Sequence, residues 1–112
     1  MACSVSEPWF AYIGNKKLVE GRLNRGVFKD LKVGELFIIH SKENPAICKN
    51  TRITGIHICK DFTELYSKFG DKLLPRECLN FGQDDDDVYL KFYSKADIEK
   101  YGVIGIEFVL IE

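Results

Sequence analysis

The sequence predicts a single α+β domain spanning residues 1–112, built as a small curved β-barrel with short helices capping or flanking it. Three observations predict this class. A chain of 112 residues with 46% hydrophobic and 29% charged residues can bury one core without metal or disulfide support. Strand-like and helix-like segments follow one another in mixed order rather than as alternating strand–helix units. A glycine interrupts a β-branched segment, as happens where barrel strands bend.

The first two predicted elements are a short strand and a short helix. Residues 2–6 alternate weakly in polarity and predict a short first strand. Pro8 favours the first turn of a helix, where its missing N–H has no partner to lose. The apolar side chains of residues 9–13 give this helix one apolar face, and Gly14 ends it.

The second predicted strand, residues 18–23, separates apolar from charged side chains. Successive side chains of a strand point to opposite faces. Val19 and Leu23 therefore share one face, whereas Glu20 and Arg22 share the other. The strand thus places two opposite charges side by side.

Two further strands occupy the middle of the chain. A turn at residues 32–35 leads into residues 36–40, which are apolar on both faces and predict a central strand. Residues 51–59 are rich in Ile and β-branched residues and predict another strand. Gly55 lies inside it and predicts a bulge or bend.

The clearest predicted helix covers residues 62–69. Asp61 and Glu64 resemble a capping box, the apolar residues repeat at helical spacing, and Gly70 occupies a C-cap position. We expect its apolar face to be buried.

A run of aspartates predicts the start of a second helix. Asp84–Asp87 precede Val88 and Phe92, and negative charges in a first turn suit the positive end of the helix dipole. The run lacks the alternating ligands of a calcium-binding loop, so no metal is expected there. A short helix at residues 94–101 and a strand at residues 103–110 complete the chain; in that strand the even-numbered residues form an apolar face.

Charge is distributed unevenly along the chain. Residues 1–60 contain ten Lys or Arg and five Asp or Glu, whereas residues 61–112 contain six and twelve. A local positive face could therefore meet phosphate while the rest of the surface repels it.

The cysteines and histidines show no metal-ligand spacing. Cys3, Cys48, Cys59 and Cys78 contain no CxxC pair, and the two histidines lie far apart in sequence. We expect reduced thiols, no metal and no cofactor. No apolar run reaches about 18 residues, and no leader-like segment opens the sequence, which predicts a cytoplasmic protein without membrane contact.

Three segments carry a family resemblance. Residues 7–10 read EPWF, and residues 13–23 read IGNKKLVEGRL, similar to a G-x-K-x-x-E-x-R signature with one extra residue before the lysine. Residues 31–35 read LKVGE, similar to a K-x-G-D/E turn. The third segment comprises FTELY, LLP, YS and YGVIGIE at residues 62–66, 73–75, 93–94 and 101–107. Together they resemble the ASCH family, a branch of the PUA-like β-barrels.

The resemblance implies a PUA-like barrel with a cleft beside the signature strand. Members of this superfamily bind RNA or modified nucleosides. Some bacterial ASCH proteins hydrolyse the amide of an acetylated cytidine, and ribonuclease activity is attributed to others. The partner implied for this chain is RNA or a nucleotide-derived small molecule.

The candidate site residues follow from the signature. Lys17 and Arg22 can bind phosphate, and the Glu20 carboxylate can accept from a base amino group. The alternative is that these charges are solvated or pair with one another. Trp9 either stacks a base or belongs to the core. Asn24 and Arg25 would extend the phosphate-binding rim.

Catalysis, if present, would fall to Lys17 and Glu20 as an acid/base pair. In the cytidine-deacetylating branch, a nucleophilic threonine stands three residues after the lysine. Glu20 occupies that position here, and a carboxylate does not easily perform the same acyl chemistry. The sequence therefore favours binding over amide hydrolysis.

Overall fold

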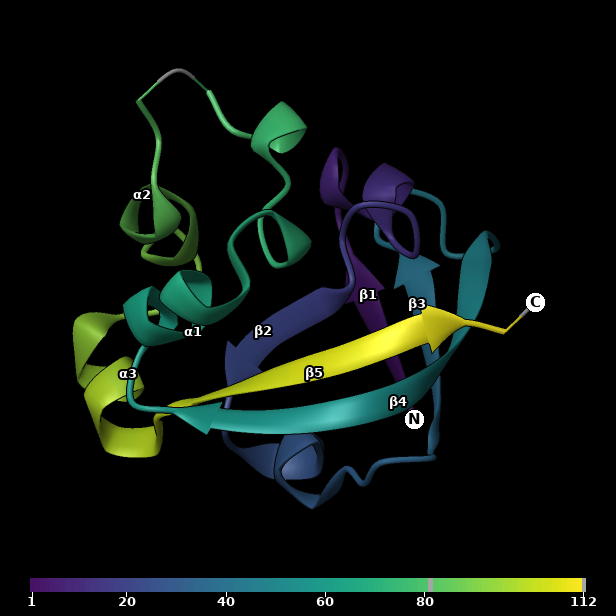
Figure 1. Ribbon diagram of the computed structural model, residues 1–112, viewed down its shortest axis with the longest axis horizontal. Helices are drawn as coiled ribbons and strands as arrows, with labels where there is room; N and C mark the ends of the chain where they lie inside the picture. The colour runs from purple at the N-terminus through teal and green to yellow at the C-terminus, as the bar shows by residue number, and fades with distance from the viewer. Residues whose placement is uncertain (81, 112) are drawn as a thin grey trace.

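The computed structural model describes residues 1–80 and 82–111 (Figure 1). Its strands are β1 (Ala2–Val5), β2 (Val19–Leu23), β3 (Leu36–Ser41), β4 (Cys48–Cys59) and β5 (Val103–Leu110). Its α-helices are α1 (Phe62–Phe69), α2 (Asp85–Tyr89) and α3 (Lys95–Tyr101). Short 3₁₀ helices are η1 (Trp9–Tyr12), η2 (Gly26–Asp30), η3 (Gly70–Lys72) and η4 (Arg76–Cys78).

The strands form one strongly curled sheet, a half-barrel, in the order β1-β3-β4-β5-β2 (Figure 1). β1 pairs with β3 in parallel, and the other neighbours are antiparallel. The two edge strands, β1 and β2, approach each other across an open seam, where the Arg22 guanidinium donates to the Ser4 carbonyl at 2.7 Å. The predicted α+β class with a curved sheet and short helices is confirmed.

The bend of β4 lies at the predicted glycine. The pairing of β4 with β5 shifts register between Ile53 and Gly55, which marks a bulge. A Cβ atom on Gly55 would lie 2.6 Å from Glu107 Oε1 and 2.9 Å from His57 Nε2. Those two side chains hydrogen-bond to each other at 2.9 Å, so glycine leaves the space in which they meet.

Apolar side chains cover both faces of the curled sheet. The concave face encloses one cluster: Val5, Phe10, Ile13, Leu31, Phe37, Ile39, Ile53, Ile104, Ile106 and Phe108. The convex face meets the helices in a second cluster: Val19, Leu23, Cys59, Phe62, Leu65, Leu73, Leu74, Val88, Tyr89, Ile98 and Val103. The α-helices gather over one end of the sheet and cover only part of its convex face (Figure 1).

Helix α1 packs against β2 and β5 at a pair of glycines. Gly21 and Gly105 are opposite one another in the β2–β5 ladder. Cβ atoms placed on them would lie 3.3 Å from Leu65 Cδ2 and 2.5 Å from Leu65 Cδ1, respectively. The missing side chains thus make room for Leu65, which is fully buried.

The helix ends follow the sequence signals. Asp61 accepts from the Glu64 N–H at 2.8 Å, and Glu64 accepts from the Lys60 N–H at 2.8 Å. Asp84 and Asp87 form a reciprocal capping box at α2. Gly70 and Gly102 have positive φ angles of 52° and 69°, which favour glycine at these helix ends. As predicted, Phe62 and Leu65 are buried, whereas Tyr66 and Phe69, for which the same is predicted, are only partly buried.

Four details correct the sequence prediction. The first helix is a 3₁₀ helix confined to Trp9–Tyr12, and β4 begins at Cys48 rather than at residue 51. Helix α2 ends at Tyr89, and Phe92 beyond it is 59% exposed. Burial of β5 is not one-sided: Val103 and Gly105 are also buried, because α1 covers that face.

Within the described part of the chain, no helix has the length and apolar character needed to cross a membrane.

Candidate ligand-binding site

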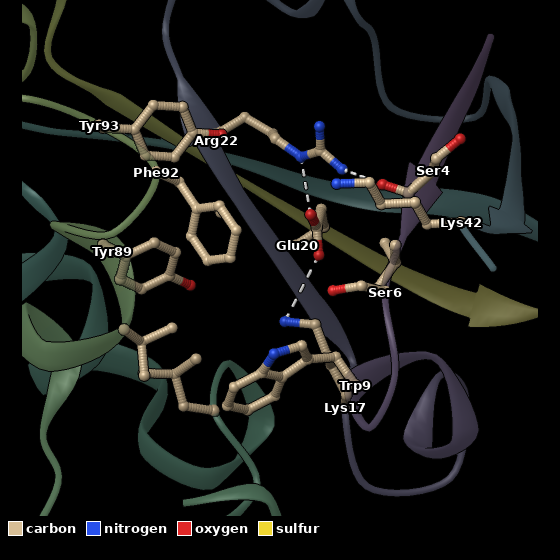
Figure 2. A pocket seen from close by; sticks show the side chains of 14 residues that line it. Ser4, Ser6, Trp9, Lys17, Glu20, Arg22, Lys42, Tyr89, Phe92 and Tyr93 are labelled. Atoms are coloured by element: carbon tan, nitrogen blue, oxygen red, sulfur yellow. Dashed lines mark hydrogen bonds and ion pairs between the residues drawn. The ribbon is translucent and has the colours of Figure 1, made fainter.

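A cavity of about 180 Å³ opens at the seam between β1 and β2 (Figure 2). Its polar lining comes from Ser4, Ser6, Lys17, Glu20, Arg22 and Lys42. Its aromatic lining comes from Trp9, Tyr89, Phe92 and Tyr93. The cavity therefore combines charged groups with flat apolar surfaces.

Strand β2 presents Glu20 and Arg22 to the cavity. They are paired with Ile106 and Ile104, whose side chains belong to the cluster on the concave face. Arg22 Nε donates to Glu20 Oε2 at 2.7 Å, and Arg22 Nη2 donates to the Ser4 carbonyl at 2.7 Å. Arg22 thereby connects the two edge strands and orients the carboxylate.

Lys17 holds the other side of the Glu20 carboxylate (Figure 2). Its Nζ lies 3.5 Å from Glu20 Oε1 and donates to the carbonyls of Val19 at 2.7 Å and Leu73 at 2.5 Å. Lys17 is 3% exposed and Glu20 is 7% exposed. One buried carboxylate thus lies between two cations, which leaves one net positive charge.

Burial and pairing shift the ionisation of this cluster in opposite directions. Removal from water lowers the pKa of Lys17, because burial disfavours the ammonium more than Glu20 stabilises it. Burial opposes the charge of Glu20, yet Arg22 and then Lys17 bring the pKa of that carboxyl below its ordinary value. Burial likewise opposes the charge of Arg22, but Glu20 raises the pKa of the guanidinium overall. Glu20 and Arg22 are therefore a stable ion pair at neutral pH.

The aromatic wall is fixed by stacking beneath it. The Phe62 ring stacks on Tyr89 with centroids 3.9 Å apart and on Tyr93 with centroids 5.5 Å apart. Burial raises the pKa of both tyrosine hydroxyls, which therefore stay neutral. Phe92 lies on the same segment and lines the cavity (Figure 2), and its side chain is exposed.

Trp9 is positioned by the short helix that it begins. It is half-buried and packs against both apolar clusters. Lys49 on β4 holds the end of η1, because its Nζ donates to the carbonyls of Phe10 at 2.9 Å and Ile13 at 3.1 Å. Trp9 therefore both packs in the apolar clusters and lines the cavity.

The structure brings four predicted site residues together, Trp9, Lys17, Glu20 and Arg22, and separates two others. Arg25 is exposed, lies 3.9 Å from Asp97 and covers the Tyr101 ring at 5.2 Å. The Asn24 N–H donates to Gly102 at 3.0 Å. Because β2 ends at Leu23, the chain turns toward α3, and Asn24 and Arg25 do not line the cavity.

Sequence reasoning missed six polar or aromatic residues of the cavity: Ser4, Ser6, Lys42, Tyr89, Phe92 and Tyr93. They come from three segments distant in sequence from the signature strand. The spacing of Tyr89 and Tyr93 was a usable signal, since it places two aromatic side chains on one side of a helical turn. Ser4, Ser6 and Lys42 carry no comparable local pattern.

Among residues 1–80 and 82–111, no three His, Cys, Asp or Glu side chains are grouped to hold a metal ion. The four cysteines are free thiols: Cys48 is exposed, Cys59 is buried, and Cys3 and Cys78 are partly buried.

Two solved structures resemble this chain over nearly its whole length. The crystal structure of hypothetical protein PH0355 has 28% sequence identity and a TM-score of 0.74, covering 99% of this chain and 100% of that one. The solution NMR structure of protein PF0455 from Pyrococcus furiosus has 26% identity and a TM-score of 0.69, covering 100% of this chain and 99% of that one. Neither a family model nor a curated protein matches the chain. The chain therefore shares its half-barrel architecture with other proteins of similar length.

Proposed function

We propose that this protein binds single-stranded RNA or a nucleotide-derived small molecule in the seam cavity. The observation that carries the proposal is the buried Lys17–Glu20–Arg22 cluster, which lies in a cavity lined by four aromatic residues, of which Phe92 is exposed. A nucleotide offers the two matching features, an anionic phosphate and a planar base.

The aromatic lining supports binding of a base. Trp9 and Phe92 both line the cavity, and Phe92 is exposed although it is a large apolar residue. Aromatic faces stack unpaired bases with little sequence preference, at roughly 1–3 kcal/mol per base. An unpaired base can enter such a cavity, whereas a base within a duplex cannot reach it without unstacking.

The charge of the cluster supports binding of an anion. Arg22 uses Nε and Nη2 for Glu20 and Ser4, which leaves Nη1 for a ligand. An arginine already held in place loses little conformational entropy when it grips a phosphate. Glu20 contributes by orienting Arg22 and Lys17, and its bond to Arg22 leaves lone pairs for a base amino group.

We also propose that the chain belongs to the ASCH branch of the PUA-like barrels. The separate resembling segments meet at one place: Lys17, Glu20 and Arg22 come from the signature, Leu73 supplies a carbonyl to Lys17, and Tyr93 lines the cavity. This convergence supports the resemblance because residues from segments matched separately in sequence line one cavity.

Hydrolysis is the second candidate, and one observation favours it. Burial lowers the pKa of Lys17, and a lysine with a lowered pKa beside a carboxylate can act as a base. Against it, Lys17 Nζ already donates to two carbonyls and contacts Glu20, so a substrate would have to displace one of these partners. Binding is therefore the function that the geometry supports better.

The test is a binding and turnover assay on the same samples. A labelled single-stranded RNA and N-acetylcytidine are each incubated with the protein, and both retention and products are measured. We expect retention without products, and we expect Arg22→Ala to weaken retention. The matched control is Lys68→Ala, which removes an exposed cation on α1 that does not line the cavity. If the protein retained neither the RNA nor N-acetylcytidine, the proposal would be contradicted. If products formed from either of them, the protein would be a hydrolase instead.

A further inference from the structure

We propose that Arg22 and Lys42 form a subsite for a terminal phosphate monoester, so that the ligand is a mononucleotide or the phosphorylated end of a single-stranded RNA. This inference rests on the proposed function, because it names which nucleotide-like ligand the seam cavity takes.

The two cations reach the cavity from opposite edges of the seam. Arg22 extends from β2 to the Ser4 carbonyl of β1. Lys42 directly follows β3, and its N–H donates to the Val5 carbonyl at 3.0 Å, which fixes its backbone against β1. Both side chains line the same cavity and extend toward Ser4 (Figure 2). A phosphate held there would contact both sides of the seam.

The charges of the lining favour a dianion. With Lys17 as an ammonium, the form that donates to the Val19 and Leu73 carbonyls and pairs with Glu20, the lining has three positive charges and one negative charge. The sum is two positive charges. Within the described residues, Lys42 lies within 4.0 Å of no carboxylate, whereas Lys17 and Arg22 share Glu20. A phosphate monoester has a charge of about −1.5 to −2 at neutral pH and would neutralise this excess. A phosphodiester with its single charge would leave about one positive charge uncompensated.

The donors around this position also match a terminal group. A monoester has three terminal oxygens to be satisfied, whereas an internal diester has two. Arg22 Nη1, the Lys42 ammonium and the Ser6 hydroxyl are donors on the cavity lining. Glu20 does not compete for these donors, because it is held by Lys17 and by Arg22 Nε.

The experiment compares ligands that differ only in the phosphate. Affinities are measured at fixed salt for uridine, uridine monophosphate, its methyl diester and inorganic phosphate. The same measurement is made for hexauridylate with a 5′-phosphate, a 3′-phosphate or hydroxyl groups at both ends. We expect uridine monophosphate to bind at least about tenfold more tightly than its methyl diester. One of the two phosphorylated hexamers should likewise bind at least about tenfold more tightly than the hexamer with hydroxyl groups at both ends.

The variants assign the effect to Lys42. Lys42→Gln should abolish the advantage of the monoester, and it should weaken binding of the hydroxyl hexamer less than binding of the phosphorylated hexamer. Lys68→Ala should leave every affinity unchanged. Equal affinities for monoester and diester would overturn the inference, and so would equal affinities for uridine monophosphate and inorganic phosphate. If in that case Trp9→Ala still weakened the binding of all nucleotides, the proposed function would survive without the phosphate subsite. If the protein bound no nucleotide and no RNA at all, the proposed function and the phosphate subsite would both fail.

Discussion

Arg22 on β2 donates to the carbonyl of Ser4 on β1 at 2.7 Å and so joins the two edges of the half-barrel. The same guanidinium donates to Glu20 at 2.7 Å and lies over the Phe28 ring at 5.2 Å. Arg22 thus belongs to the cavity and to the framework that shapes it, and any change at this residue should affect both ligand binding and stability.

The structural part of this role predicts a loss of stability. Arg22→Ala should lower the free energy of unfolding by about 1–3 kcal/mol, since it removes charged hydrogen bonds and leaves Glu20 with only Lys17 as a cationic partner. Urea denaturation measures this change. Lys68→Ala, an exposed substitution, should stay within about 0.5 kcal/mol. A loss below that value for Arg22→Ala would mean that the seam does not depend on this side chain.

The ionised Glu20 predicts a specific pH dependence. Its pKa in the folded protein is below the ordinary value of 4.5, so the unfolded chain takes up the proton first as the pH falls. The stability that Glu20 contributes is present above pH 4.5 and is lost as the pH falls through the lower folded value. The difference in unfolding free energy between the parent protein and Glu20→Gln should therefore be largest near pH 6–7 and shrink toward pH 3.

Other carboxylates titrate in the same range, which is why the difference between the two proteins is measured rather than the parent alone. A difference that does not change with pH between 3 and 7 would show that Glu20 is not held as an anion by Lys17 and Arg22.

The glycine pair under α1 predicts a coupled effect on stability. Leu65→Ala should cost about 2–5 kcal/mol, as is typical for fully buried leucines. Gly105→Ala should also destabilise, because its Cβ would lie 2.5 Å from Leu65 Cδ1. In the Leu65→Ala background the Gly105→Ala substitution should cost less. Denaturation of the two single variants and the double variant tests this, and strictly additive effects would contradict the contact.

The cysteines should differ in reactivity. Burial raises the pKa of Cys3 to about 12, and Cys59 is buried, whereas Cys48 is exposed. In native protein at pH 8, iodoacetamide should modify Cys48 first and Cys3 and Cys59 only after unfolding. Mass spectrometry should show four alkylations of the unfolded, unreduced protein and no bound metal. A mass lower by about two or four daltons before alkylation would instead indicate disulfides.

Much of the framework could be predicted because its signals are local. The capping pattern at Asp61 and the glycine at position 70 bounded α1 correctly, since helix ends depend on neighbouring residues. Gly55 marked the bulge of β4 for a similar reason. The length of α2 could not be predicted, because Tyr89 and Tyr93 are held by stacking on Phe62, a contact with another helix.

The site was predictable only where it lies on one strand. Alternation along β2 placed Glu20 and Arg22 on a common face, as the structure shows. The sequence left two interpretations of Glu20 and Arg22 open, a ligand site or a mutual ion pair. In the structure the two side chains form an ion pair and also line the cavity. Lys42 and Ser4 could not be assigned, since the parallel pairing of β1 with β3 brings them to the cavity from segments distant in sequence. The burial of Lys17 depends on the Leu73 carbonyl, which comes from a distant segment.

Trp9, the one tryptophan of the sequence, lines the cavity and reports directly on its occupation. Tryptophan fluorescence is measured while uridine monophosphate or hexauridylate is added at fixed salt. We expect a saturable change in the parent protein and in Lys68→Ala, and a curve shifted to at least about tenfold higher ligand concentration in Arg22→Ala. A folded parent protein whose fluorescence shows no saturable change with any of these ligands, or an Arg22→Ala curve that coincides with the parent curve, would contradict nucleotide binding at the seam.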